Sequence, residues 1–142
     1  MTRVLVLNGP NLGRLGARVP DVYGTQTLDD LHAQLSSEAQ GHDIELRQTD
    51  TEGELLGWLY EAMDASTPVV LNAGAWSHYS YALHDAVEMV TTAGVPVIEV
   101  HISNPHAREV FRHTSVLTSV ATGVIAGFGF DSYRLALTQL LR

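Results

Sequence analysis

Residues 97–104, Val-Ile-Glu-Val-His-Ile-Ser-Asn, predict a strand of a buried parallel sheet that ends in polar groups. The first half is apolar and β-branched, and the turn Gly94-Val95-Pro96 separates it from the preceding segment. A strand covered on both faces should be apolar on both, yet Glu99, His101 and Ser103, spaced by two, are polar and point to one face. This stretch alone leaves two interpretations open, a satisfied ion pair at the sheet rim and a histidine oriented by glutamate for chemistry.

Short apolar runs alternate with amphipathic stretches along the whole chain. Strands are expected at 3–8, 44–50, 69–71, 97–104 and 122–126, and helices at 27–41, 52–65, 79–93, 105–111 and from 131 onward. Thr27 and Asp30 fit a capping box. Asp131 is expected to cap the last helix, whose apolar stripe would be Leu135, Leu137, Leu140 and Leu141. This order predicts an α/β fold in a single domain, residues 1–142, with a doubly wound five-stranded parallel sheet. The alternating residues 44–50 suit an edge strand.

The composition excludes several classes of protein. The chain is 45% hydrophobic and 17% charged, and no apolar run approaches the roughly 20 residues of a membrane span. The N-terminal residues run directly into a strand, so we expect no signal peptide, no membrane partner and a cytoplasmic location. A net charge of -8 argues against nucleic-acid binding. Without cysteine or lysine, the chain has no thiolate nucleophile, no Cys-ligated metal and no lysine imine.

Residues 9–24 form a long connection with four glycines and two prolines, which forbid a helix. Connections of this length are usually functional or disordered. The glycines do not follow the G-x-G-x-x-G spacing and no G-K-[ST] follows, so a nucleotide fingerprint is absent. Asn8, Asn11, Asn72 and His101 follow or end three predicted strands, so we expect them at the carboxyl edge of the sheet, where such folds bind ligands.

Three groups of residues resemble the motifs of type II 3-dehydroquinate dehydratases over essentially the whole chain. They are Asn8-Gly9-Pro10-Asn11-Leu12 with Arg18, Pro20, Tyr23 and Gly24; Asn72-Ala73-Gly74 with His78 and Asp85; and Glu99-Val100-His101-Ile102-Ser103-Asn104 with Arg108 and Arg112. The resemblance implies a flavodoxin-like fold and the reversible anti elimination of water from 3-dehydroquinate to 3-dehydroshikimate, through an enolate. It implies no metal and no organic cofactor. The reaction serves the shikimate pathway of aromatic amino acid biosynthesis or quinate breakdown.

The resemblance also implies the catalytic roles. Tyr23 would remove the proton α to the ketone, and Arg18 would hold Tyr23 ionised. Asn11 would stabilise the enolate oxygen through an ordered water, as preorganised donors do. His101, oriented by Glu99, would protonate the leaving hydroxyl group. Residues 9–24 would then be a lid over the active site.

The remaining implied residues bind the substrate. The backbone N–H groups of Ile102 and Ser103, the Ser103 hydroxyl and Asn72 would hold the carboxylate and its neighbouring hydroxyl. His78 and Arg112 would contact ring hydroxyls. Asp85 would complete the site from a neighbouring subunit, because the family forms homo-oligomers in which trimers assemble into dodecamers.

Two positions depart from the family pattern, and one alternative function remains open. Val19 stands where the family usually has glutamate, and Tyr79 where threonine is common. The rival is a non-catalytic flavodoxin-like binding module. A receiver domain would need an acidic cluster after the first strand and a lysine after the fifth, and an FMN binder would need a Ser/Thr-rich loop. Residues 9–16 contain neither serine nor threonine.

Overall fold

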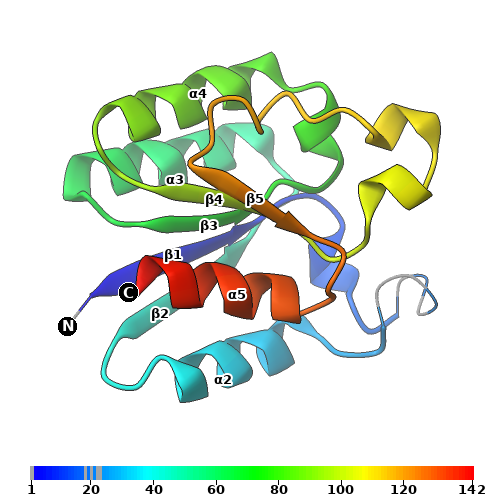
Figure 1. Cartoon of the computed structure of the whole chain (residues 1–142), viewed down its shortest axis with the longest axis horizontal. Helices are drawn as coiled ribbons and strands as arrows, with labels where there is room; N and C mark the ends of the chain where they lie inside the picture. The colour runs from blue at the N-terminus through cyan, green and yellow to red at the C-terminus, as the bar shows by residue number, and fades with distance from the viewer. Residues whose placement is uncertain (1, 18, 20, 22–23) are drawn as a thin grey trace.

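The computed structural model describes residues 2–17, 19, 21 and 24–142 and shows a five-stranded parallel sheet between two layers of helices (Figure 1). The strands are β1 (Arg3–Asn8), β2 (Asp43–Gln48), β3 (Val69–Asn72), β4 (Val97–His101) and β5 (Gly123–Ala126). The helices are α2 (Leu28–Glu38), α3 (Glu52–Ala65), α4 (Tyr81–Thr92) and α5 (Asp131–Leu140), and the 3-10 turns are η1 (Leu12–Arg14), η2 (Gly74–His78), η3 (Pro105–Ala107) and η4 (Val110–Arg112). The strand order β2-β1-β3-β4-β5 is that of flavodoxin-like folds, so the predicted fold and the edge position of β2 are confirmed.

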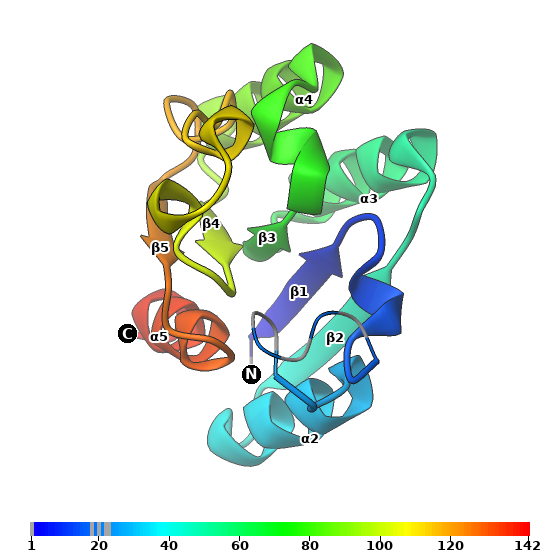
Figure 2. The same ribbon diagram turned by 90° about the vertical axis from the view of Figure 1, so that its right-hand side faces the viewer.

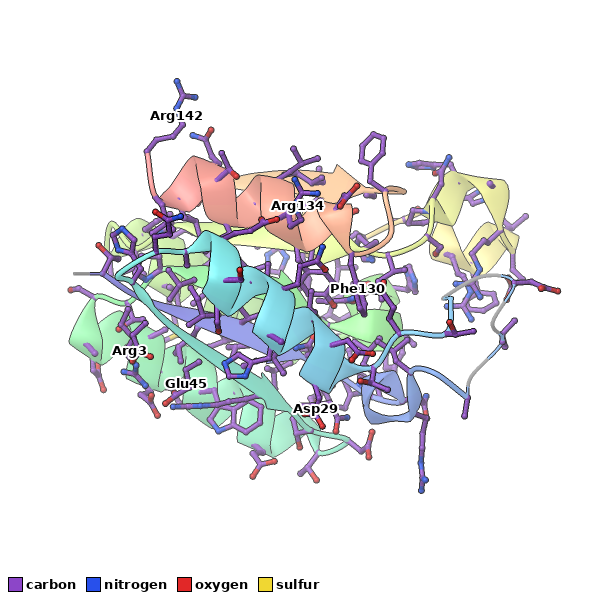
Figure 3. All side chains as sticks on the ribbon, turned by 90° about the horizontal axis from the view of Figure 1, so that it is seen from below. Arg3, Asp29, Glu45, Phe130, Arg134 and Arg142 are labelled. Carbon is purple, nitrogen blue, oxygen red and sulfur yellow. The ribbon has the colours of Figure 1, made fainter. Side chains whose placement is uncertain are left out.

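Alternate residues of the strands pack into two separate cores. Val4 and Val6 of β1 are fully buried against the layer formed by α2 and α5, which lie side by side in Figure 3. Leu5 and Leu7 are fully buried against α3 and α4 on the other face. Burial of each such leucine stabilises the folded state by about 1.5–3 kcal/mol relative to an exposed side chain. This alternation also decides which face each polar residue at a strand end can reach.

Serine and threonine side chains set the start of two helices. The capping box of α2 is confirmed, since Thr27 Oγ1 accepts from the Asp30 N–H at 3.2 Å and Asp30 Oδ2 accepts from the Thr27 N–H at 2.9 Å. The helix expected at residues 79–93 is α4, which begins two residues later than predicted, at Tyr81. Ser80 Oγ accepts from the Leu83 N–H at 3.0 Å and so caps α4, while the preceding segment forms η2.

The last helix differs from its prediction at the N-terminus and on its buried face. Phe130 occupies the cap position of α5, and Asp131 is the first helical residue. The Asp131 carboxylate accepts from Arg134 Nη1 at 2.7 Å, so the predicted cap by Asp131 is wrong. Leu135, expected in the apolar stripe, is 48% exposed. The buried face of the helix instead carries Tyr133, fully buried in the core shared with α2.

The polypeptide leaves β1 and β3 through two turns that touch each other. A Cβ atom on Gly9 would lie 2.5 Å from the carbonyl oxygen of Ala73, which is far inside contact distance. Only glycine therefore permits this approach. It brings the start of the 9–24 loop against η2, and Figure 2 shows the four 3-10 turns gathered around the carboxyl ends of the strands. Among the described helices, none has the length and apolar composition to cross a lipid bilayer.

Candidate active site

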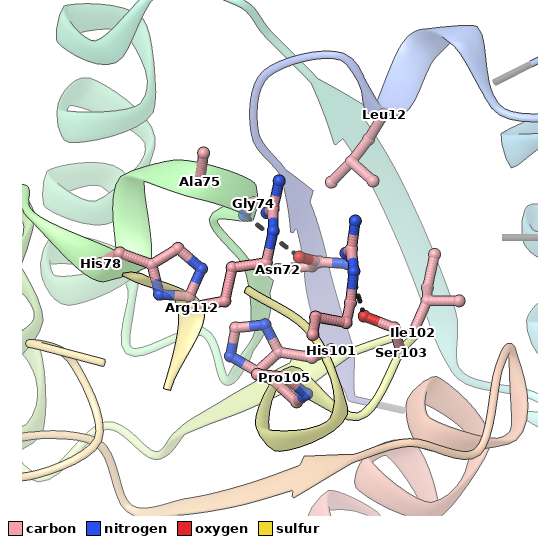
Figure 4. A pocket seen from close by; sticks show the side chains of 11 residues that line it. Leu12, Asn72, Gly74, Ala75, His78, His101, Ile102, Ser103, Pro105 and Arg112 are labelled. Atoms are coloured by element: carbon pink, nitrogen blue, oxygen red, sulfur yellow. Dashed lines mark hydrogen bonds between the residues drawn. The ribbon is translucent and has the colours of Figure 1, made fainter. Parts of the chain in front are cut away.

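A cleft open to solvent lies at the carboxyl ends of β3 and β4 (Figure 4). Segments from three separate parts of the chain contribute to it: the residues after β1, the residues after β3, and the segment that follows β4. Its lining residues are Leu12, Asn72, Gly74, Ala75, His78, His101, Ile102, Ser103, Pro105, Arg108 and Arg112.

A buried carboxylate orients His101 in this cleft. Glu99, only 1% exposed, places Oε2 at 2.6 Å from His101 Nε2. The same oxygen accepts from Ser115 Oγ at 2.7 Å, and Oε1 accepts from Thr118 Oγ1 at 2.6 Å. Burial raises the pKa of Glu99, but the hydrogen bonds from His101, Thr118 and Ser115 outweigh burial and hold this pKa below its usual value.

The ionised carboxylate decides which nitrogen of His101 is available for chemistry. Because an ionised carboxylate can only accept, His101 Nε2 carries the hydrogen that Glu99 receives. Nδ1 is then the ring nitrogen left for a reacting group. Glu99 also stabilises the imidazolium that arises when Nδ1 takes up a proton. The pair can therefore deliver a proton to a leaving group in the cleft.

His78 stacks beside His101 as a second, neutral imidazole. The two ring centroids are 6.4 Å apart and the ring planes differ by 16°. His78 Nδ1 lies 2.9 Å from the carbonyl oxygen of Thr114, which fixes Nδ1–H as the donor and leaves Nε2 without its hydrogen. Burial, together with His101 and the charge of Arg112, holds the pKa of His78 below its usual value. His78 is thus suited to accept a hydrogen bond from a hydroxyl group.

Two guanidinium groups give the cleft a positive character. Arg108 Nη1 donates to Ser103 Oγ at 3.3 Å, and Arg112 Nε donates to Glu109 Oε2 at 3.1 Å. The Arg112 guanidinium also lies 4.6 Å from the centroid of the Phe111 ring. The chain has a net charge of -8 and only eight positively charged side chains, and two of them line this cleft. The cleft is therefore suited to a small anion.

The Asn72 side chain is held by a backbone N–H two residues away and by a tyrosine distant in sequence. Its Oδ1 accepts from the Gly74 N–H at 3.1 Å, and its Nδ2 donates to the Tyr133 hydroxyl at 2.8 Å. Sequence analysis did not single out Tyr133, nor did it single out Ser115 or Thr118, which bind Glu99. Arg108 was quoted in a motif but given no role. No local pattern marks these residues, because their partners come from other elements of the fold.

The structure brings only part of the predicted site together. Asn72, His78, His101, Ile102, Ser103 and Arg112 line the cleft, and Glu99 lies directly behind His101. Asn11 is exposed and does not line it; its left-handed backbone, with φ of 68°, precedes η1, and its N–H donates to Asp50 Oδ1 at 2.9 Å. Asp85 is exposed on α4 and does not line the cleft either. Arg18 and Tyr23 lie outside the described residues.

Comparisons with known proteins agree along nearly the full length of the chain. The family profile described as "Dehydroquinase class II" matches residues 2–141. The 3-dehydroquinate dehydratase of Salinispora arenicola is 59% identical, with 97% of this chain and 96% of that protein covered. That of Bacillus licheniformis is 54% identical, with 99% and 97% covered. The crystal structure of the type II dehydroquinase from Propionibacterium acnes superposes with a TM-score of 0.94 at 53% identity, covering 99% of this chain and 96% of that one.

Proposed function

The chain belongs to the class II dehydroquinase family, and from this membership we infer that it dehydrates 3-dehydroquinate to 3-dehydroshikimate, as a hydro-lyase. The reaction is a reversible anti elimination of water through an enolate. The observation that carries this proposal in the structure is the Glu99–His101 pair, 2.6 Å apart, in a cleft that two arginines make suitable for a carboxylate substrate. The rival, a non-catalytic binding module, has no support from the three relatives described above, each of which is named as an enzyme.

His101 is proposed to protonate the leaving hydroxyl group. Its Nε2 is occupied by Glu99, so Nδ1 of the imidazolium delivers the proton. Glu99 acts by keeping the ring in one orientation and by stabilising its charged form. The buried Glu99 carboxylate performs this role only while it is ionised, which its hydrogen bonds favour.

Tyr23 is proposed as the base that removes the α-proton on the opposite face of the substrate. A free tyrosine has a pKa of about 10, so only about 0.1% would be ionised at pH 7. Arg18, five residues away in the 9–24 loop, is proposed to lower this pKa by its positive charge. Asn11 is proposed to stabilise the enolate oxygen through an ordered water. The 9–24 loop would close over the substrate as a lid, with Val19 in place of the family's usual glutamate.

The substrate carboxylate is proposed to bind at the end of β4. The N–H groups of Ile102 and Ser103, the Ser103 hydroxyl and the Asn72 amide are the donors for it and its neighbouring hydroxyl. His78 and Arg112 are proposed to bind ring hydroxyls. The neutral state of His78 and the charge of Arg112 suit this division, since one accepts and the other donates.

Asp85 is proposed to act in the site of a neighbouring subunit. Its exposure on α4, away from the cleft of its own chain, is compatible with this role. The corresponding assembly is a dodecamer of four trimers, as the resemblance to the family implies. We further propose that the enzyme works in the cytoplasm, in the shikimate pathway of aromatic amino acid biosynthesis or in quinate breakdown.

The decisive experiment follows the enone absorbance of the product after 3-dehydroquinate is added to the purified protein. The parent chain should produce this absorbance, and the His101→Ala variant should lose on the order of 10²-fold or more in turnover. The half-buried His42, which does not line the cleft, is replaced by alanine as the matched control. No signal from the parent chain at high protein concentration would refute the proposed function.

A further inference from the structure

A buried chain of hydrogen bonds connects Asn72 to the last helix. Tyr133 of α5 is fully buried, and its hydroxyl group accepts from Asn72 Nδ2 at 2.8 Å and donates to Asn8 Oδ1 at 2.7 Å. Asn8 Nδ2 donates in turn to the carbonyl oxygen of Arg47 on β2, at 3.1 Å. The chain runs behind the cleft and links α5 to the carboxyl ends of β1, β2 and β3.

The sheet geometry explains why these three side chains meet. Asn8 and Asn72 are register partners at the ends of the neighbouring strands β1 and β3. Both continue the alternation of Val4, Val6 and Val70, whose side chains face the layer of α2 and α5. Helix α5 covers this face of the sheet in Figure 1, so its buried tyrosine reaches both amides.

The order of donors and acceptors leaves one orientation for the Asn72 amide. A phenol has a single hydrogen, and Asn8 receives it because Asn8 Nδ2 already points to the Arg47 carbonyl. The phenol oxygen can therefore only accept from Asn72, whose Oδ1 takes the Gly74 N–H. The second hydrogen of Asn72 Nδ2 remains for the cleft that Asn72 lines. Burial raises the pKa of Tyr133, so the hydroxyl keeps its hydrogen.

We infer that Tyr133 is a positioning residue, which holds the Asn72 amide with an N–H donor, and not the carbonyl oxygen, directed to the substrate. This inference rests on the proposed function, in which Asn72 is a donor to the substrate carboxylate. If the amide were free to turn, its carbonyl oxygen would face that carboxylate and repel it. Because the carboxylate does not react, the contact is the same in the ground state and the transition state, and its loss acts on KM more than on kcat.

The first test is Tyr133→Phe, which removes one oxygen atom. We expect KM for 3-dehydroquinate to rise by about 3- to 10-fold, the range for one hydrogen bond, with kcat nearly unchanged. Tyr60→Phe removes the same atom from a tyrosine that is 42% exposed on α3 and should retain the parent constants. Val90→Ala, in the core on the other face of the sheet, is the control for lost stability and should not raise KM.

The second test asks whether Tyr133 acts through Asn72. KM is measured for Asn72→Ala with and without Tyr133→Phe, and we expect the second substitution to have no further effect on KM. A merely structural role would raise KM by the same factor in both backgrounds, and that result would overturn the inference. An unchanged KM in folded Tyr133→Phe would overturn it as well.

A third variant keeps the inference testable if Tyr133→Phe does not fold. Asn8→Ala removes the acceptor that fixes the phenol hydrogen but leaves the tyrosine in place. Its KM should rise in the parent background and not in the Asn72→Ala background, and an unchanged KM would contradict the inference. If the parent chain itself does not convert 3-dehydroquinate, the proposed function fails; if the parent is active and these variants keep its KM, only the role of Tyr133 fails.

Discussion

Replacement of Thr118 by valine tests how the Glu99 carboxylate is kept ionised. Oε1 of Glu99 accepts from Thr118 Oγ1 at 2.6 Å, whereas Oε2 accepts from both His101 and Ser115. Valine has nearly the shape of threonine but no hydroxyl group, so Oε1 would lose this donor in a residue that is 1% exposed. A hydrogen bond to a charged group is worth about 1.5–3 kcal/mol. Because Thr118 itself is exposed, we expect the lower value, about 1.5 kcal/mol, and a fall in Tm of about 5 °C.

The pH dependence distinguishes this effect from simple packing. The folded pKa of Glu99 lies below its usual value, so the carboxylate stabilises the fold above its unfolded pKa, about 4.3, and this stabilisation disappears as the pH falls through the folded pKa. Thr118→Val raises the folded pKa and should therefore reduce the free energy of unfolding at pH 7. The difference between variant and parent should shrink once Glu99 is protonated in both states.

The assay is urea denaturation at a series of pH values from neutral to acidic, with kcat against pH measured in parallel. The acid limb of kcat should move to higher pH in the variant, because Glu99 must be ionised to orient His101. Thr138→Val, a threonine exposed on α5, is the matched control and should change neither profile. A loss of stability that stays constant from pH 7 to acidic pH would refute the reasoning, because it would show that the hydroxyl acts without the carboxylate.

Three further predictions concern the reaction and the assembly. Tyr23→Phe should abolish proton removal, and Arg18→Ala should lower kcat on the order of 10²-fold and shift the alkaline dependence of kcat to higher pH. The measurement is kcat against pH, with circular dichroism to confirm folding. Near-parent turnover by folded Tyr23→Phe would exclude Tyr23 as the base. Borohydride added with the substrate should leave activity and protein mass unchanged, because the chain has no lysine to form an imine, and a stable adduct in the mass spectrum would contradict this. Light scattering should give the mass of a dodecamer. Oligomers that contain both Asp85→Asn and Arg112→Ala subunits should regain activity that each variant alone lacks. If mixing restores no activity, each site lies within one chain.

Local sequence patterns predicted the bounds of a strand or helix correctly where the residues that determine those bounds all lie within that element. β1 and α3 have the predicted bounds, because an unbroken apolar run and a leucine stripe determine them. The start of α4 was predicted too early because the 3-10 turn η2 directly precedes it, and the sequence does not separate that turn from the helix. The cap of α5 was wrong because Asp131 pairs with Arg134 one turn later instead of with the backbone.

The same distinction applies to the candidate site. The contact of Glu99 with His101 could be predicted, since a spacing of two on a strand places both side chains on one face. The contacts of Glu99 with Ser115 and Thr118 span 16 and 19 residues, and that of Asn72 with Tyr133 spans 61. Such contacts depend on where the loops and helices pack, which no local pattern encodes.

The contact between Gly9 and Ala73 sets a boundary for protein engineering. Both partners meet through main-chain atoms, so no change of rotamer can make room for a side chain at residue 9. If the 9–24 loop acts as the proposed lid, Gly9 is therefore excluded as its pivot. A mutant library or a loop exchanged with a relative should keep Gly9 and Ala73 together and vary the sequence from Asn11 onward. Loop exchanges that place a side chain at residue 9 should yield insoluble protein, whereas exchanges that begin at Asn11 should preserve the sheet.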